Sequence, residues 1–421
     1  MFDRRAFLKN GGLALVTLGA GPAFLTRAAA AAPGARPFHR RKVLVTIFQR
    51  GAMDGLMAVQ PLDDPHLASL RPRLHLRADR RADADRRTRD LGIGYGLHPA
   101  FDPLLPLWRD GHLAIVHGVG SPDPTRSHFD AQDFMESGTP GRKGTPDGWL
   151  NRVVGALGHD ATPFRAVAMT PALPRSFYGD APAVAVEDLS TFRVDLPGAA
   201  PLAASAGQGF EALYASAAED LLRDTAADTF DAVATLDRLD VRAYRPAQGV
   251  DYPDSALGQA MRQIAFLIKS NVGLEVAFAE SGGWDTHVRQ GVGGGSFAAR
   301  ARDLAQSMMA FWRDLGAWRD DVTLMTMTEF GRTVAENGSA GTDHGHASCL
   351  FVVGGDVRGG QLYGGVPRLA NRNLFEGRDL PMVVDFRAVF SAVARRRFDL
   401  ADDVTLFPGW TGAGMIELFR A

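Results

Sequence analysis

The chain has 421 residues, of which 46% are hydrophobic and 22% are charged, and its formal net charge is −2. These proportions are typical of a soluble globular protein with a sizeable core. The small net charge excludes an overall electrostatic attraction to nucleic acid or to an anionic membrane, so we expect no nucleic-acid partner.

The N-terminal segment has the order of features of a twin-arginine export signal. Arg4 and Arg5 precede a modest apolar stretch over residues 11–25, and the alanines of residues 28–32 provide small side chains for cleavage. The apolar stretch is shorter than the about 20 residues of a permanent membrane helix. We therefore expect a signal peptide over residues 1–31, export by the twin-arginine translocase, a periplasmic or secreted location and no permanent membrane anchor. An uncleaved anchor is the alternative.

Short apolar runs alternate with helical patterns along the rest of the chain. This alternation predicts an α/β fold with a mostly parallel central sheet flanked by helices. A proline- and alanine-rich stretch at residues 196–206 is the one candidate boundary, and we expect a single domain with inserted loops over residues 32–421. The predicted strands cover residues 42–48, 113–119, 164–169, 274–279, 322–328 and 348–353, and the predicted helices cover residues 209–222, 226–239, 256–270 and 297–315.

The single cysteine, Cys349, excludes an intramolecular disulfide. It lies in an apolar run, which indicates a buried structural thiol and not a nucleophile. His98 and His117 are interpreted in the same way, as structural histidines with satisfied hydrogen bonds.

Polar segments follow the first two strands of the predicted sheet. Asp54 lies in the turn GAMDG, where it could complete a metal site, bridge two ions or only shape the turn. Thr125, Arg126 and Ser127 precede a helix predicted over residues 128–136. Either hydroxyl is a candidate nucleophile activated by a metal, and Arg126 is a candidate for holding an anionic substrate. Ser127 could equally be only the N-cap of the helix.

Two further segments follow later strands. Asp285 and His287 are two residues apart in GGWDTH, and in extended backbone such positions face the same side, so that both could bind one ion. A structural Asp–His hydrogen bond is the alternative. Glu329 and Arg332 come at the end of the strand predicted over residues 322–328.

The segment GTDHGH is the most concentrated signal. Asp343, His344 and His346 are three potential ligands within four residues, with glycines on both sides. Neutral imidazoles and carboxylates are the ligands that a zinc-type ion requires. Because ligands in an α/β protein gather at the carboxyl ends of the strands, we expect this loop to share one site with the earlier segments.

The motifs FQRGAMDGL, RSHFDAQDFMESG, GGWDTHVRQ, TMTEFGRT and GTDHGHAS together resemble the bacterial DUF1501 family of exported proteins. That family is in turn similar to the alkaline phosphatase and sulfatase superfamily, which implies an alkaline phosphatase-like fold with metal ions at the carboxyl ends of a parallel sheet. The resemblance implies metal roles for Asp54, for Asp285 with His287, and for His344 or His346. It places the nucleophile at Thr125 or Ser127.

One departure from the superfamily falls at Glu329-Phe330-Gly331, where its members usually have an Asp-His-Gly metal pair. Phenylalanine cannot bind a metal, so a second ion would lose a ligand or recruit another one.

These observations predict a metal-dependent hydrolase of a small anionic ester, phosphate or sulfate. A divalent ion, with zinc expected, would activate the attacking hydroxyl, and Arg126 or Arg332 would neutralise charge in the transition state. The expected metal ligands are Asp54, Asp285, His287, Glu329, Asp343, His344 and His346. The alternative is a non-catalytic binding or assembly protein that retains the fold.

Overall fold

The computed structural model describes residues 16–17, 40–79, 81–159, 161–191, 239, 241–401 and 403–420. The predicted signal peptide lies outside the described residues, apart from the two residues of β1. The helices predicted over residues 209–222 and 226–239 also lie outside them, apart from residue 239.

A ten-stranded sheet runs through the centre of the molecule, in the order β1-β8-β7-β9-β2-β10-β11-β6-β12, with β13 also paired to β6. A second sheet, in the order β3-β5-β4, lies beside it. The strands are β1 (Val16–Thr17), β2 (Val43–Gln49), β3 (Val59–Pro61), β4 (Arg89–Asp90), β5 (Tyr95–Leu97), β6 (Leu113–Gly120), β7 (Ala166–Ala168), β8 (Ala183–Ala185), β9 (Val276–Ser281), β10 (Val322–Met327), β11 (Ser348–Gly354), β12 (Gln361–Gly364) and β13 (Val384–Asp385).

The pairing confirms the predicted mostly parallel sheet. The strands β8, β7, β9, β2 and β10 are parallel to one another. Strand β11 is antiparallel to both of its neighbours, β10 and β6, and β1 is antiparallel at the edge. All six strands predicted from the apolar runs are present. Because β11 runs the opposite way, the segment before it, and not the one after it, lies at the carboxyl edge of the parallel strands.

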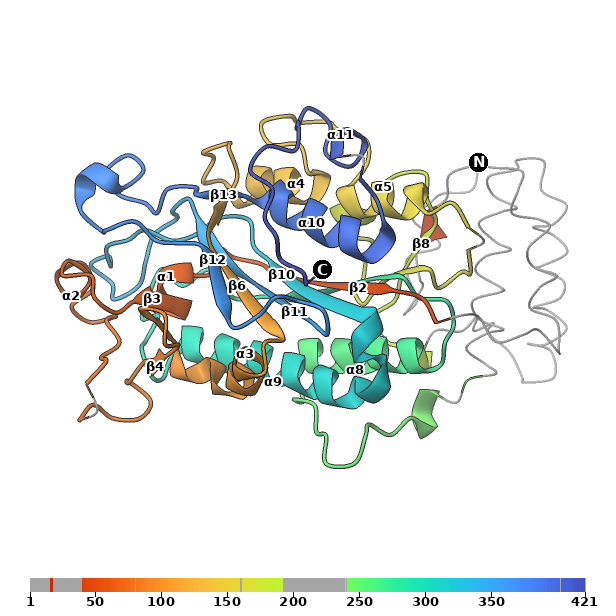
Figure 1. Cartoon of the computed structure of the whole chain (residues 1–421), viewed down its shortest axis with the longest axis horizontal. Helices are drawn as coiled ribbons and strands as arrows, with labels where there is room; N and C mark the ends of the chain where they lie inside the picture. The colour runs from red at the N-terminus through yellow and green to blue at the C-terminus, as the bar shows by residue number, and fades with distance from the viewer. Residues whose placement is uncertain are drawn as a thin grey trace, which may run out of the picture.

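Helices cover both faces of the sheet (Figure 1). Helices α3, α8 and α9 lie on one face, and α4, α5 and α10 lie on the other. Both described helices that the periodicity predicts are present, α8 over 256–270 and α9 over 297–315, to within one residue at each end. The helices are α1 (Gly55–Ala58), α2 (Leu67–Leu70), α3 (Leu105–Arg109), α4 (His128–Ser137), α5 (Trp149–Ala156), α8 (Ala256–Lys269), α9 (Ser296–Leu315), α10 (Phe386–Phe398) and α11 (Asp403–Leu406), and the 3-10 helices are η2 (Pro99–Leu104), η3 (Arg175–Phe177), η4 (Leu189–Thr191), η5 (Val241–Ala243), η6 (Gly316–Asp321) and η7 (Asn371–Asn373).

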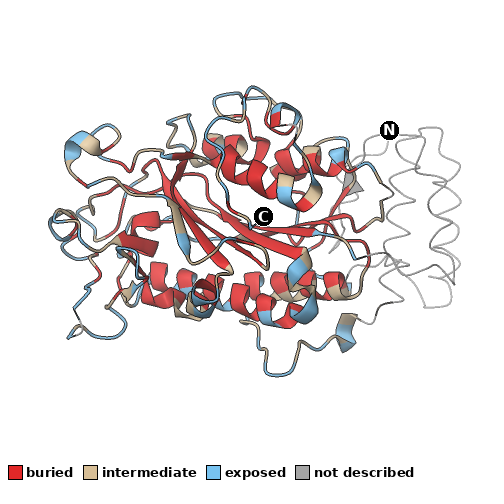
Figure 2. Cartoon of the chain, viewed as in Figure 1, coloured by how far each residue is buried: buried red, intermediate tan, exposed pale blue. Residues whose placement is uncertain are grey.

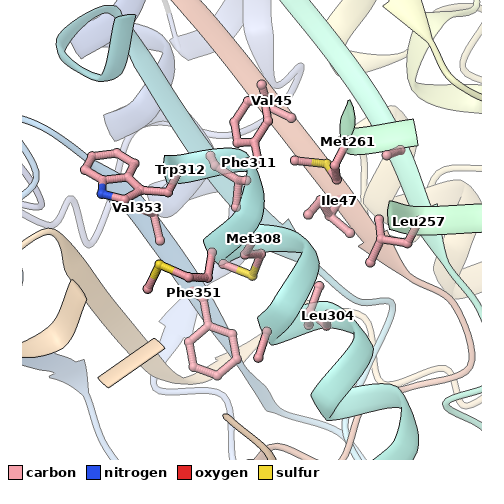
Figure 3. Packing of buried hydrophobic residues seen from close by; sticks show 14 of the residues in the cluster. Val45, Ile47, Leu257, Met261, Leu304, Met308, Phe311, Trp312, Phe351 and Val353 are labelled. Carbon is pink, nitrogen blue, oxygen red and sulfur yellow. The ribbon is translucent and has the colours of Figure 1, made fainter. Parts of the chain in front are cut away.

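The alternation of side chains along each strand produces two cores. Val45 and Ile47 of β2 pack under α8 and α9, while Leu44 and Phe48 point to the opposite face. Figure 3 shows the first core, where side chains of α8 and α9 meet those of β2 and β11. The strands and the inward helix faces are buried (Figure 2), as the near-continuous apolar runs in the sequence predict. Cys349 is buried in this core, as expected. Among the described residues, no helix is long and apolar enough to cross a membrane.

Candidate metal centre

Four loops meet at the carboxyl edge of the parallel strands. They follow β2, β6, β9 and β10, and the loop after β10 leads into the antiparallel β11. The predicted polar segments therefore lie at one edge of the sheet. The two ends of the loop between β10 and β11 pair with each other, because Gly345 N donates to Gly331 O (2.8 Å) and Gly331 N donates to His346 O (2.8 Å). A Cβ at Gly331 would lie 1.8 Å from the carbonyl oxygen of Ala347, so this approach requires glycine.

Three side chains form the centre of the site. His128, Asp285 and His344 each offer a ligand atom, and these atoms all lie within 4.8 Å of one another. A fourth side chain, His287, joins them: its Nε2 lies 2.9 Å from His344 Nε2 and 3.0 Å from Asp285 Oδ1. We refer to His128, Asp285, His287 and His344 as the metal centre.

Each imidazole of the metal centre is oriented by an oxygen acceptor. His128 Nδ1 lies 2.9 Å from Glu329 Oε1, and His287 Nδ1 lies 3.0 Å from Asp343 Oδ1. His344 Nδ1 lies 2.8 Å from the carbonyl oxygen of Arg126. Carboxylate and carbonyl oxygens only accept, so the Nδ1 atom of each ring carries the proton. In the neutral rings, each Nε2 therefore presents a lone pair.

These three lone pairs converge with a carboxylate. Two facing lone pairs at 2.9 Å repel each other, and a cation or an added proton is needed between them. His128 Nε2 is buried and has no hydrogen bond to any described residue, while Asp285 Oδ2 lies 3.6 Å away. Around a tetrahedral ion with metal–nitrogen bonds of about 2.0–2.1 Å, neighbouring ligand atoms lie about 3.3 Å apart. The separations of 2.9 to 3.3 Å among Asp285 Oδ1 and the Nε2 atoms of His287 and His344 are near that value, and His128 Nε2 lies 3.6 Å from Asp285 Oδ2, so these residues are candidate ligands of a zinc-type ion.

The electrostatics of the site keep its carboxylates charged. Burial alone would raise the pKa of Asp285, but the hydrogen bond and charge of Arg332, whose Nη1 lies 2.7 Å from Asp285 Oδ1, hold it below its usual value. Burial likewise opposes ionisation of Glu329, but hydrogen bonds from His128 and its neighbours lower the pKa. The hydrogen bond to Glu329 raises the pKa of His128, and burial lowers the pKa of His344. A basic imidazole beside a fixed carboxylate is the usual arrangement of a metal-binding histidine.

Phe330 explains the departure from the superfamily motif. Its ring is buried, with its centroid 5.0 Å from that of His128 and 5.1 Å from that of His344. It packs against two imidazoles of the metal centre and contributes to their orientation. The position therefore offers no ligand to an ion.

Two predicted ligands lie behind the metal centre and do not point into it. Glu329 is almost fully buried, and Oε1 accepts from His128, from Gln132 Nε2 (2.9 Å) and from Gly51 N (2.8 Å). Asp343 accepts from His287 and from Asn337 Nδ2 (3.0 Å). Both carboxylates hold a histidine in place, so each is a positioning residue in this structure.

Asp54, another predicted ligand, lies outside the metal centre in this structure. It is buried in an ion pair with Arg71, whose Nη1 lies 2.8 Å from Oδ2, and it also accepts from Gln290 Nε2 (2.7 Å) and Met57 N (3.0 Å). These donors occupy both oxygens, and Met57 N makes Asp54 the N-cap of α1. The sequence could not show this pairing, because Arg71 lies 17 residues from Asp54 and no local pattern links the two.

His346, also a predicted ligand, faces away from the metal centre. Its side chain is buried and stacks on Phe375, with ring centroids 4.5 Å apart, and it is not part of the metal centre. Of the two histidines that the resemblance left open, the structure brings His344 into the cluster.

The predicted catalytic residues are also engaged. Ser127 Oγ accepts from Asp130 N at 3.4 Å and caps α4, and Thr125 Oγ1 accepts from Ser127 N at 3.3 Å. The guanidinium of Arg126 binds Asp379 and Glu376. Arg332 is buried against Asp285 and the backbone of Thr342. Both arginines are thus held by carboxylates, and Arg332 fixes the candidate ligand Asp285.

Sequence reasoning missed His128 as a candidate ligand. It is the first residue of α4 and stands directly after the predicted cap, at the edge of the sheet where the other ligands lie. The sequence analysis also did not identify Gln132, one helical turn later. Its Oε1 accepts from Arg50 Nη1 (3.0 Å) and its Nε2 donates to Glu329 Oε1 (2.9 Å). The spacing of four residues on a short helix at a strand's carboxyl end is the signal that could have identified both.

Comparisons with known proteins place the chain in a family. The sequence model of the DUF1501 family, described as "Protein of unknown function (DUF1501)", matches residues 114–407, which is more than half of the chain. The chain belongs to this family. The comparison with curated proteins found no match.

One solved structure similar to this chain is the lipoteichoic acid synthase LtaP from Listeria monocytogenes, with 9% sequence identity and a TM-score of 0.34. The similarity covers 82% of this chain and 74% of that one. A TM-score of this size carries no argument about chemistry, which rests on the metal centre.

Proposed function

We propose that the protein is a metal-dependent hydrolase of phosphate or sulfate esters that holds one divalent ion at the metal centre. The observation that carries the proposal is that ligand atoms of His128, Asp285 and His344 lie within 4.8 Å of one another, with His287 Nε2 2.9 Å from His344 Nε2 and 3.0 Å from Asp285 Oδ1. Nitrogen-rich sets of this kind suit Zn²⁺, with other divalent transition ions as competitors.

The burial of Asp54 and the presence of Phe330 favour a single ion. A two-metal site requires a bridging or second set of ligands, and these two positions are where the superfamily resemblance would place them. Here one is occupied by Arg71 and the other is apolar.

The chain's own residues would organise the reaction. Glu329, Asp343 and the Arg126 carbonyl fix the three rings, and Arg332 fixes Asp285. A bound ion would polarise the ester oxygen and activate a water or hydroxyl near neutral pH. The side chains of Asp285 and His287 are 44% and 38% exposed, which gives an ester access from solvent. Because Ser127 Oγ already caps α4, we assign the attack to water.

The twin-arginine motif supports the expected location. We propose that the translocase exports the folded protein to the periplasm or beyond, where it meets small anionic esters. Folding before export would assemble the metal centre in the cytoplasm.

A binding or assembly protein is the second candidate. Four protein ligands would complete a tetrahedral shell, as in structural zinc sites, and both arginines assigned to the substrate are engaged with carboxylates. Metal binding without turnover would identify this candidate.

The first test is metal content. Protein purified without chelator should contain about one equivalent of a divalent transition ion per chain, and His344→Ala should lose most of it. His346→Ala is the matched control, two residues away in the same loop, and should retain the ion. Equal metal content in the two variants would contradict the assigned centre.

The second test is turnover on an aryl phosphate, a phosphodiester and an aryl sulfate. Hydrolysis of one of these that chelator abolishes, that added Zn²⁺ restores and that His344→Ala lacks would support the hydrolase. Stoichiometric metal with no turnover on any of the three would refute it in favour of the binding protein.

A further inference from the structure

An arginine-lined cavity of about 360 Å³ lies beside the metal centre and is not used by it. Arg73, Arg86 and Arg289 line it together with the glycine-rich loop of residues 291–294. These arginines and this loop lie close to His287.

Two of the three guanidiniums are unpaired. Arg73 is bound to Glu336 and to the carbonyl of Asn337 (2.7 Å), and it forms a fixed wall. The side chains of Arg86 and Arg289, by contrast, form no hydrogen bond or ion pair with the part of the chain that the structure describes. Asp85 is the one carboxylate in the lining. The cavity therefore has an excess of positive charge, which favours an anion.

The glycine-rich loop adds backbone donors. From Gly291 to Gly295, no N–H group donates to a backbone acceptor among the described residues. The loop turns tightly, because a Cβ at Gly291 would lie 1.9 Å from the carbonyl oxygen of Gly294, while the Cβ position of Gly294 is open. Successive unpaired N–H groups beside arginines form a common binding arrangement for phosphate and sulfate oxygens.

The cavity and the metal centre are formed in part by the same two segments of the chain. Arg289 N donates to Ser339 O and Gln290 N to Ala340 O, so residues 287–290 lie along residues 339–343. His287 and Asp343 are at one end of this pairing, and Arg289 and Ala340 are at the other. Two residues of chain span at most about 7 Å between Cα atoms. A molecule of modest size can therefore reach both places.

We infer that the cavity binds a phosphate or sulfate group and that, if the proposed hydrolase function holds, the substrate is an ester with a second anionic group seated there. Arg86 and Arg289 would replace the engaged Arg126 and Arg332 as the cations that select the substrate.

The direct test uses metal-free protein in chelator at low salt, titrated with inorganic phosphate and with sulfate in a calorimeter. Each charged hydrogen bond lost should weaken binding roughly tenfold or more, so Arg289→Gln should raise Kd by at least that factor, and the Arg86→Gln and Arg289→Gln double variant should abolish binding. Asp85→Asn should tighten binding severalfold, since it removes the competing carboxylate. Arg109→Gln, an exposed arginine of α3 at the opposite edge of the sheet, is the matched control and should bind as the parent protein does.

Unchanged phosphate and sulfate binding in the double variant, or no binding by the parent protein, would overturn the inference. The result is independent of the proposed function, because His344→Ala should retain anion binding without metal. Arginine-dependent anion binding in a protein that binds no metal would support the anion site in the cavity and refute the hydrolase.

A kinetic comparison tests the assignment to the substrate. Two substrates are compared, an aryl monophosphate and an aryl phosphate that carries a second phosphate group. Arg289→Gln should raise the KM of the second ester by a factor at least tenfold larger than that of the first, because only the second ester loses a charged hydrogen bond. Equal changes for the two esters would refute the second anionic group and leave a site for free anions only.

Discussion

Replacing Glu329 by glutamine tests the metal centre without removing a ligand. Glutamine has the same shape, and its carbonyl oxygen can still accept from His128, Gln132 and Gly51. Its amide NH₂ can donate to the hydroxyl of Thr328, which lies 3.1 Å from Glu329 Oε2 in the parent protein. The fold should therefore survive, and only the negative charge behind His128 is lost.

The expected effect is a weaker metal–nitrogen bond. The hydrogen bond to Glu329 is the largest cause of the raised pKa of His128, so the neutral partner makes the imidazole less basic. Loss of such an outer partner typically costs 10–100-fold in metal affinity, about 1.4–2.8 kcal/mol. Competition with a chromophoric chelator, and the visible spectrum of the Co²⁺ form, would measure this change.

The matched control is Glu275→Gln. Glu275 is also buried and also contacts a histidine, His159, at 2.8 Å, but it lies just before β9 at the amino edge of the sheet. This variant should keep the parent affinity. If Glu329→Gln binds the ion as tightly as the parent does, or if both variants weaken equally, then Glu329 does not act on the ion through His128.

Four other predictions follow from the same structure. Burial lowers the pKa of His98 and of His117 from 6.5 to about 4, so the folded state binds fewer protons than the unfolded state. The free energy of unfolding should be highest above pH 6.5 and fall towards pH 4 by about 3 kcal/mol for each histidine. Urea unfolding of chelated protein that shows no loss of stability over this range would contradict the prediction. Arg71→Met leaves Asp54 buried without its cationic partner, which should cost about 3–5 kcal/mol, whereas folded Asp54→Asn should keep its full metal content; metal loss in folded Asp54→Asn would restore Asp54 as a ligand. Ser127→Ala should lower stability by about 0.5–1 kcal/mol through the lost cap and retain turnover, whereas a loss of activity of several orders of magnitude would make Ser127 the nucleophile. Replacing Arg4 and Arg5 by lysine should keep the protein in the cytoplasm on cell fractionation, and unchanged export would exclude the twin-arginine route.

The strands and the meeting of the loops could be predicted because they depend on local pattern. Continuous apolar runs identify strands buried on both faces, and the carboxyl ends of parallel strands must share an edge. The direction of β11 could not be predicted, since a buried run reads the same in both orientations. That direction places the segment with His344 at the site. The motif GTDHGH indicated that this segment could bind a metal, but it did not indicate at which edge of the sheet the segment lies.

The division between ligands and positioning residues depends on contacts between distant parts of the chain. Asp54 and Asp285 are both aspartates after buried strands, but Asp54 meets Arg71 and Asp285 meets three imidazoles. His344 and His346 are two residues apart, and the pairing of Gly331 with Gly345 turns one towards His128 and the other towards Phe375. No pattern in one sequence distinguishes the members of these pairs.

The three oxygen acceptors behind the imidazoles differ, and this difference bears on whether the metal centre is closed. Glu329 is buried and the Arg126 carbonyl belongs to a segment fixed by two ion pairs, so His128 and His344 are firmly held. His287 is the most exposed of the three rings and rests on Asp343, whose side chain is 55% exposed. It is therefore the ligand that can move away at least cost and leave a position for a substrate oxygen. Catalytic sites keep such a position open, whereas structural sites do not. His287→Ala should consequently lower metal affinity less than His344→Ala does, which metal titration of the two variants would measure, and the reverse order would favour the non-catalytic protein.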